Sequence, residues 1–273
     1  MVNGDQNIKT TARDTELRDG IQRKIGRTRR FLPTQLAIET VRACNAKCTM
    51  CPSETMARPK GVMKPKVHQL ILEKIYDWGA PISLITHAGL GEHLLDRRLH
   101  ARIAAEKAAF PKAEVVVYTN GALLTKTRAP ELLDSGLDVL SVSINGFRKE
   151  TYEAVMKIPR ETTFRRVERF IEMKSKAGSA MKVYVSMVRT ELCSDQEVEE
   201  FKAYWRDRAD GVVIPEWITW GNFLDPVAPA EQFPCSYIWK TMMIDFDGTV
   251  KMCCEDYDSR FPRGSLVTQH PDE

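Results

Sequence analysis

The 273-residue sequence lacks the features of several common protein classes. No apolar run approaches the roughly 18 residues that cross a bilayer as a helix. Residues 1–30 are polar and charged, so no secretory signal peptide is expected. A formal net charge of +3 is too small to argue for a nucleic-acid partner, and no internal repeat or low-complexity tract is present. The sequence therefore predicts a cytoplasmic globular protein that engages neither nucleic acid nor membrane.

The composition is that of an ordinary folded chain. Hydrophobic residues make up 43% and charged residues 28%, which allows a core of normal size. The length suits one large α/β domain with an appendage, or two modest domains. In a cytoplasmic protein the seven cysteines are expected to be free, metal-bound or catalytic rather than paired in disulfides.

Hydrophobic periodicity divides the chain into alternating strands and helices after a polar leader, residues 1–33. The expected strands are 36–40, 81–86, 114–118, 139–144, 182–188 and 211–217, and the expected helices are 66–78, 94–109, 130–135, 163–176 and 195–208. Six strands alternating with helices predict a parallel sheet, in a domain spanning residues 34–220. Residues 221–273 break this alternation, and we interpret them as a small separate module with a β-hairpin around Asp247-Gly248.

Three cysteines follow the first expected strand. Cys44, Cys48 and Cys51 form a C-x3-C-x2-C pattern in one loop. Three thiolates can hold three irons of a four-iron cluster and leave the fourth iron open for chemistry. The alternatives are buried thiols or a structural zinc site, although zinc normally takes four ligands and no histidine occurs before His68. The Asn120 and Asn145 turns also follow strands, so they are expected at the same edge of the sheet, where ligands of parallel sheets collect.

The pattern resembles the radical S-adenosylmethionine (SAM) superfamily. Gly89-Leu90-Gly91-Glu92 is similar to the "GGE" motif of that family, with His93 where proline is common. The stretches Tyr118–Gly121, Ser141–Gly146 and Glu150–Tyr152 are also similar to stretches of the family, except that it usually has Asp-Gly where this chain has Asn145-Gly146. The resemblance covers residues 35–217 and implies a partial (β/α)6 barrel.

The resemblance also implies roles for individual residues. Cys44, Cys48 and Cys51 would ligate a [4Fe-4S] cluster with one open iron. The residues implied in binding SAM are Gly89, Gly91, Glu92, Asn120, Ser143, Asn145 and Arg189. Of these, Glu92 would receive the methionyl amine, Ser143 and Asn145 would meet the ribose or carboxylate, and Arg189 would pair with the carboxylate. For Ser143, Asn145 and Arg189, an ordinary turn or surface position is the alternative.

The C-terminal module resembles the SPASM or twitch auxiliary iron-sulfur domain. Cys235 and Cys253 are spaced as C-x12-G-x4-C, which would bring both thiols to one auxiliary cluster. Family members continue with a further C-x2-C, whereas this sequence stops at Glu273. The alternatives are a truncated chain, an incomplete cluster or a ligand other than cysteine.

Two further cysteines are candidates for catalysis. Cys254 is a cluster ligand, a bystander or a thiol that donates a hydrogen atom to a substrate radical. Cys193 follows the fifth expected strand, and it is either a small apolar residue, or a hydrogen donor or substrate contact.

The expected function is that of a radical SAM oxidoreductase or epimerase. It would cleave SAM reductively, abstract a hydrogen atom, and epimerise or dehydrogenate a small polar substrate such as a sugar, cyclitol or aminoglycoside. The electron would come from a flavodoxin- or ferredoxin-type reductant. The alternatives are a peptide- or protein-modifying maturase and a non-catalytic iron-sulfur electron carrier.

Overall fold

The structure is a computed structural model that describes residues 32–215 and 235–273. Nearly all of the expected leader and residues 216–234 therefore lie outside the described residues, as does the proposed domain boundary at residue 220. None of the described helices is long and apolar enough to span a bilayer.

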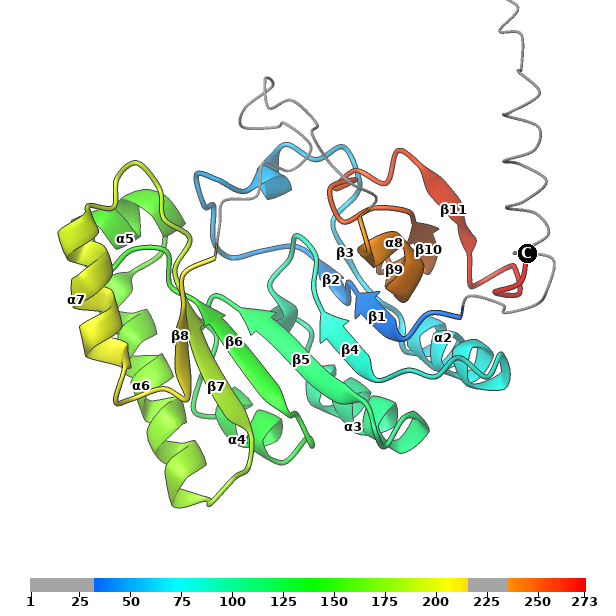
Figure 1. The fold of residues 1–273 in the computed structure, drawn as a ribbon, viewed down its shortest axis with the longest axis horizontal. Helices are drawn as coiled ribbons and strands as arrows, with labels where there is room; N and C mark the ends of the chain where they lie inside the picture. Colours follow the sequence, from blue (N-terminus) through cyan, green and yellow to red (C-terminus); the bar gives the residue numbers. More distant parts are fainter. Residues whose placement is uncertain (1–31, 216–234) are drawn as a thin grey trace, which may run out of the picture. The chain divides into compact units, whose positions relative to one another are not determined.

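A parallel sheet forms the centre of the described chain (Figure 1). Its six expected strands are β1 (Gln35–Ile38), β4 (Leu84–His87), β5 (Glu114–Thr119), β6 (Val139–Ser143), β7 (Lys182–Ser186) and β8 (Gly211–Val213). Each pairs in parallel with the next in the order β1-β4-β5-β6-β7-β8. The predicted α/β class and partial barrel are confirmed.

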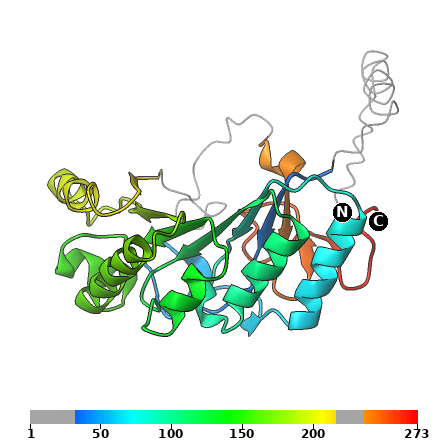
Figure 2. The same ribbon diagram turned by 90° about the horizontal axis from the view of Figure 1, so that it is seen from below.

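Helices connect successive strands, as the right-handed crossover of parallel strands requires. They are α2 (Pro65–Asp77), α3 (Leu99–Ala109), α4 (Arg128–Leu133), α5 (Lys149–Met156), α6 (Arg160–Lys176) and α7 (Asp195–Trp205). Figure 2 shows α2, α3 and α4, coloured cyan to green, along one side of the sheet. Apolar residues at helical spacing, such as Ile71 and Ile75 of α2, face the sheet and are fully buried.

Two helices differ from the sequence prediction. The helix expected over 94–109 begins only at Leu99, because the preceding residues form the 3-10 turn η2 (His93–Leu95). Side chains stabilise that turn: Glu92 accepts a hydrogen bond from the Leu94 amide and Asp96 accepts one from the Arg98 amide. Helix α5 was not predicted at all. Tyr152, Val155 and Met156 stand at helical spacing and are buried, but the helix has only eight residues, too few for its period to stand out from the sequence alone.

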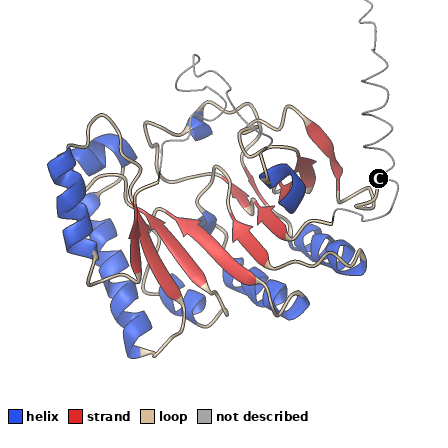
Figure 3. Ribbon diagram, in the orientation of Figure 1, coloured by secondary structure: helices blue, strands red, loops and turns tan. Residues whose placement is uncertain are grey.

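The C-terminal segment adds strands to the same sheet. The predicted hairpin is confirmed: β9 (Thr241–Ile244) and β10 (Thr249–Lys251) pair antiparallel around Gly248, which has a φ of +91°. Beyond it, β11 (Pro262–Ser265) pairs with β10. Strand β9 also lies parallel to β1, from Gln35 opposite Thr241 to Ile38 opposite Ile244. The hairpin thus continues the barrel sheet, and Figure 3 shows its strands beside β1.

Candidate active site

The cysteine loop lies beyond the carboxyl ends of the barrel strands (Figure 1). The loop lies in the chain between two short strands, β2 (Val41–Arg42) and β3 (Gly61–Val62), which pair antiparallel. Beneath the loop is a pocket of about 230 Å³. Nine residues proposed from the sequence line it: Cys44, Cys48, Cys51, Gly89, Gly91, Glu92, Asn120, Ser143 and Asn145. These residues come from four separate stretches of the chain, and the parallel topology brings them to one place.

The thiols of the loop contact polar and sulfur groups. Cys44 Sγ accepts from the Ala46 amide at 3.4 Å and from Asn120 Nδ2 at 3.7 Å. Cys48 Sγ lies 3.4 Å from Met156 Sδ. Burial raises the pKa of Cys44 to about 11 and that of Cys48 to about 12, and the neighbouring cysteines of the triad add to both increases. The thiolate forms therefore need a positive centre beside them.

The arrangement fits an iron-sulfur cluster better than a single metal ion. Among the described residues, no group of three or more His, Cys, Asp or Glu side chains is placed to hold one ion. Zinc needs its ligands to converge on one point, whereas three cysteines of a cluster each bind a different iron atom. Three half-buried thiols around one pocket match the second requirement, so we take Cys44, Cys48 and Cys51 as the residues that would hold a cluster.

Glu92 is buried at the base of this pocket and receives several hydrogen bonds. Its Oε1 accepts from Thr119 Oγ1 at 2.7 Å and from the Leu94 amide at 3.0 Å, and its Oε2 accepts from the Asn120 amide at 2.8 Å. Burial raises the pKa of Glu92 above its usual range, although these bonds oppose the increase. A carboxylate held in this way is suited to receive a cationic amine from a ligand.

Gly91 permits the approach of the Glu92 loop to the cysteine loop. A Cβ atom at Gly91 would lie 1.9 Å from the Val41 carbonyl oxygen. The Glu92 amide then donates to the Ala43 carbonyl at 2.8 Å. Any side chain at Gly91 would separate the two loops and move Glu92 away from the thiols.

Two asparagines that line the pocket are fixed by hydrogen bonds. Asn120 Nδ2 donates to Asn45 Oδ1 at 2.9 Å. Asn145 Oδ1 accepts from the Val188 amide at 2.9 Å, and its Nδ2 lies 3.3 Å from Met156 Sδ. Both side chains are therefore oriented by the protein before any ligand binds.

The end of helix α5 supports the cysteine loop, a role that the sequence did not reveal. The Thr49 amide donates to the Val155 carbonyl at 2.9 Å, and the Lys47 amide donates to the Met156 carbonyl at 3.3 Å. The Met156 side chain is buried and also lines the pocket. The last carbonyls of a helix need donors from outside it, and the cysteine loop supplies two of them.

Two residues proposed for the site do not line this pocket. Arg189 has a half-exposed side chain that pairs with Asp195 at 2.8 Å. Cys193 is buried, with its Sγ 3.6 Å from Thr190 Oγ1. The proposed roles of Arg189 in binding SAM and of Cys193 as a hydrogen donor stay predictions.

The three C-terminal cysteines lie on two segments. Cys235 is exposed just before the short helix α8 (Tyr237–Lys240), and Cys253 and Cys254 follow strand β10. Partial burial raises the pKa of Cys254 to about 11, with further contributions from Cys253, Glu255 and Cys235. Cys253 and Cys254 are adjacent in the chain, whereas Cys235 lies on the separate segment before α8.

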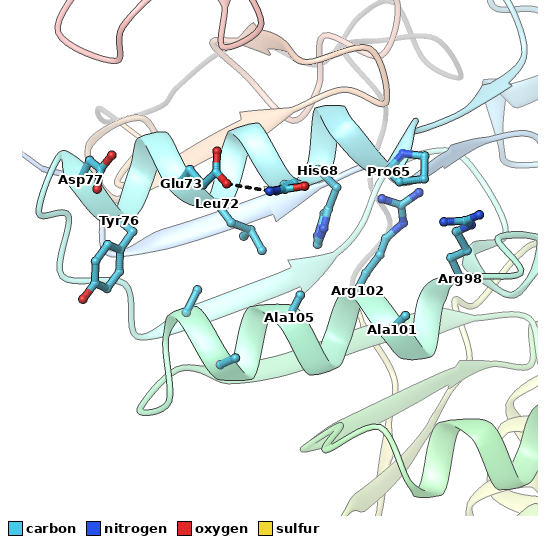
Figure 4. Close-up of a pocket in the computed structure, with 13 residues that line it drawn as sticks. Pro65, His68, Leu72, Glu73, Tyr76, Asp77, Arg98, Ala101, Arg102 and Ala105 are labelled. Carbon is cyan, nitrogen blue, oxygen red and sulfur yellow. Dashed lines mark hydrogen bonds between the residues drawn. The ribbon is translucent and has the colours of Figure 1, made fainter.

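A larger hollow lies elsewhere, between α2 and α3 (Figure 4). Its volume is about 590 Å³, and its α3 wall is formed by alanines such as Ala101 and Ala105. None of the residues proposed from the sequence for cluster or SAM binding lines it.

One pocket of a parallel partial barrel is lined by three thiols, a buried carboxylate and two asparagines. This combination is the one expected of an enzyme that binds a small ligand beside an open-iron cluster. Residues 38–202 match the family model of the radical SAM superfamily. The chain belongs to this superfamily, which implies a [4Fe-4S] cluster and SAM as cofactors.

Comparison with curated proteins gives relatives whose names describe SAM-dependent enzymes. The chain is similar to the S-adenosyl-L-methionine-dependent 2-deoxy-scyllo-inosamine dehydrogenase of Niallia circulans, with 26% identity over 87% of this chain and 80% of the relative. It is also similar to the AdoMet-dependent heme synthase of Methanosarcina barkeri, with 27% identity over 59% of this chain and only 44% of that protein.

Solved structures share the fold. BtrN in complex with AdoMet and 2-DOIA matches with a TM-score of 0.59 and 20% identity, over 88% of this chain and 80% of that chain. Streptococcus suis SuiB bound to the precursor peptide SuiA matches with a TM-score of 0.70 and 14% identity, over 99% of this chain and 72% of that chain.

Proposed function

We propose that this radical SAM enzyme is a dehydrogenase of a small polar substrate of the aminocyclitol type. The observation that carries the proposal is the similarity to the Niallia circulans dehydrogenase, which spans most of both chains. The cysteine triad and Glu92 around one pocket agree with it. With cluster and SAM bound, the site would supply reductive SAM cleavage and removal of a substrate hydrogen atom.

The residues of the chain would bind and orient these groups. Cys44, Cys48 and Cys51 would hold the cluster, and Glu92 would receive the SAM amine beside Gly89 and Gly91. Asn120, Ser143 and Asn145 line the same pocket and would contact the rest of SAM. An electron would enter from a flavodoxin- or ferredoxin-type reductant.

An auxiliary cluster is the second part of the proposal. Oxidising an alcohol removes two electrons, of which the hydrogen atom carries one, so the substrate must pass a second electron to an acceptor. Cys235 and Cys253 would ligate this acceptor, with Cys254 as a ligand or a hydrogen donor. The C-x12-G-x4-C spacing of Cys235 and Cys253, with its glycine in the turn of the β9–β10 hairpin, supports this assignment. In a variant with Cys44, Cys48 and Cys51 all replaced by alanine, the iron that remains would measure the auxiliary cluster. A variant without iron would refute the auxiliary cluster.

The test uses the anaerobically reconstituted chain with SAM, dithionite and 2-deoxy-scyllo-inosamine. We expect 5′-deoxyadenosine together with a product two hydrogens lighter. In deuterated water, deuterium at a carbon of an isomeric product, lost in Cys254→Ala, would instead identify an epimerase. If the protein carries a full cluster but forms no 5′-deoxyadenosine, the result would favour a non-catalytic electron carrier.

Peptide modification is a second candidate function. The match to SuiB bound to its precursor peptide covers nearly the whole chain at the higher TM-score, but its low identity supports the fold alone. Turnover of a precursor peptide together with inertness toward aminocyclitols would favour this alternative.

A further inference from the structure

Four buried charged side chains form one ion network outside the pocket. Arg58 donates to both oxygens of Glu39, at 3.0 and 2.9 Å. The same guanidinium lies 3.1 Å from Asp245, and Lys251 pairs with Asp245 at 3.0 Å. We call Glu39, Arg58, Asp245 and Lys251 the buried ion network.

The network is balanced in charge, with two carboxylates and two cations. The side chains of Glu39 and Asp245 are 2% exposed, and those of Arg58 and Lys251 are 12% and 10% exposed. Burial raises the pKa of Glu39, but Arg58 opposes the increase. Removing one member alone would leave one uncompensated charge in this largely buried network.

The members come from three parts of the chain that belong to different functional segments. Glu39 follows β1 and lies against the loop of Gly89 and Glu92. A Cβ atom added at Gly89 would lie only 3.0 Å from Glu39 Oε2. Arg58 lies in the loop that continues from Cys51. Asp245 and Lys251 belong to the C-terminal hairpin.

A second set of hydrogen bonds joins the loop of Arg58 to the segment that follows the C-terminal hairpin. The side chain of Asp258 accepts from the amides of Ala57 and Arg58 at 2.8 and 3.3 Å. Arg58 Nε donates to the Tyr257 carbonyl at 3.0 Å. Cys253 and Cys254 lie between Lys251 and Tyr257, so the short loop that carries them is anchored at both ends to Arg58 or its partners.

We propose that Arg58 is a positioning residue that holds the Cys253–Cys254 loop at a fixed place relative to the Cys44–Cys51 loop. The proposal rests on the proposed function, in which the substrate loses a hydrogen atom at the SAM site and an electron to the acceptor that Cys235 and Cys253 would hold. A fixed separation keeps the two steps coupled, since electron transfer and hydrogen abstraction both depend on the distance to the substrate.

The test uses a charge-balanced double variant, Glu39→Gln with Arg58→Met, because it removes one carboxylate and one guanidinium together. Lys60→Met is the matched control: Lys60 lies in the same loop, but its side chain is 57% exposed and pairs with Glu54 at the surface. Arg58→Lys tests rescue, since it keeps the charge. Asp258→Ala weakens the same anchor without touching the buried charges.

The first readout needs no cluster. In the full chain before reconstitution, we expect iodoacetamide to alkylate Cys253 about fivefold faster in the double variant, as the loss of a hydrogen-bonded anchor implies. Asp258→Ala gives a rise in the same direction. Arg58→Lys gives a rate between those of the double variant and the wild type, because it keeps the charge but loses the paired hydrogen bonds of the guanidinium. Lys60→Met leaves the Cys253 rate unchanged, and buried Cys193 is labelled at the same rate in every variant. An unchanged Cys253 rate in both the double variant and Asp258→Ala overturns the proposal.

The second readout is the ratio of 5′-deoxyadenosine to oxidised 2-deoxy-scyllo-inosamine in reconstituted protein. We expect the ratio to rise severalfold in the double variant while the iron bound by the Cys44–Cys51 loop stays at the wild-type level. An unchanged ratio contradicts coupling through Arg58. If the wild type forms no oxidised product, the proposed function fails, whereas the alkylation result still decides the anchoring.

Discussion

Glu92 is the most tightly bound acidic side chain of the pocket. Three donors fix its carboxylate, and two of them, Thr119 and Asn120, belong to the end of β5. The sequence identified Glu92 through its motif, but it gave no sign of these donors, because they depend on how β4 and β5 align. The same holds for Met156, which contacts Cys48 and Asn145 yet stands in no recognisable pattern.

Glu92→Gln is expected to weaken SAM binding by about 10- to 100-fold, because a charge-assisted hydrogen bond contributes about 1.5–3 kcal/mol. Equilibrium binding of SAM to the reconstituted enzyme measures the loss. Glu131→Gln, which changes a carboxylate 41% exposed at the surface, serves as the control and should bind SAM as the wild type does. Equal affinities of wild type and Glu92→Gln would contradict the assignment.

Between β4 and the helices α2 and α3 lies a buried chain of polar side chains. Glu106 of α3 bonds to His68 Nε2 at 2.7 Å and to His87 Nε2 at 2.9 Å. The rings of His87 and His93 lie edge to face at 5.8 Å, and His93 Nδ1 lies 3.0 Å from Thr40 Oγ1. This chain joins the helix layer to the start of the Glu92 turn.

Acid should destabilise the protein through this chain. Burial and the neighbouring His87 lower the pKa of His93 from 6.5 to about 3. Between these values the unfolded chain binds the extra proton, so folding stability decreases as the pH falls. Burial alone would raise the pKa of Glu106, but His87 and His68 lower it from 4.5 to about 2. Folding stability therefore continues to decrease as the pH falls below 4.5.

His93→Asn tests this, because it removes the titrating ring and keeps an acceptor near Thr40. Urea unfolding of the metal-free chain between pH 6.5 and 4.5 should show a pH slope smaller than that of the wild type by up to about 1.4 kcal/mol per pH unit. His270→Asn, at an exposed site, should leave the slope unchanged. Identical slopes for wild type and His93→Asn would show that His93 is not held neutral.

The helices and strands that the sequence predicted are those whose own residues determine their conformation. Strands such as Glu114–Thr119 are rich in β-branched residues, and the Asp247-Gly248 turn is a strong hairpin signal. Helix α5 and strand β11 were missed because contacts from elsewhere decide them: α5 ends against the cysteine loop, and β11, Pro-Arg-Gly-Ser, becomes a strand through its pairing with β10.

The largest difference from the sequence interpretation concerns how the C-terminal segment joins the whole molecule. Strand β9 was expected in a module beside the barrel, but it pairs with β1 in parallel along all four residues of each strand. No local pattern reports this pairing, since the two strands are separated by most of the chain. The order β9-β1-β4 makes β1 an inner strand, and the buried ion network then connects both sides of the junction.

A chain that ends at Lys240 should therefore fail to fold as a stable barrel. The deletion turns β1 into an unpaired edge, exposes fully buried side chains such as Leu36 and Ile38, and leaves Arg58 without Asp245. Far-UV circular dichroism and urea unfolding measure the effect, with a chain ending at Pro271 as the control. We expect the control to unfold cooperatively near the wild-type midpoint and the shorter chain to aggregate or to lose its cooperative transition. A shorter chain with the wild-type midpoint would mean that the barrel is stable without β9, and that the hairpin is the independent module the sequence suggested.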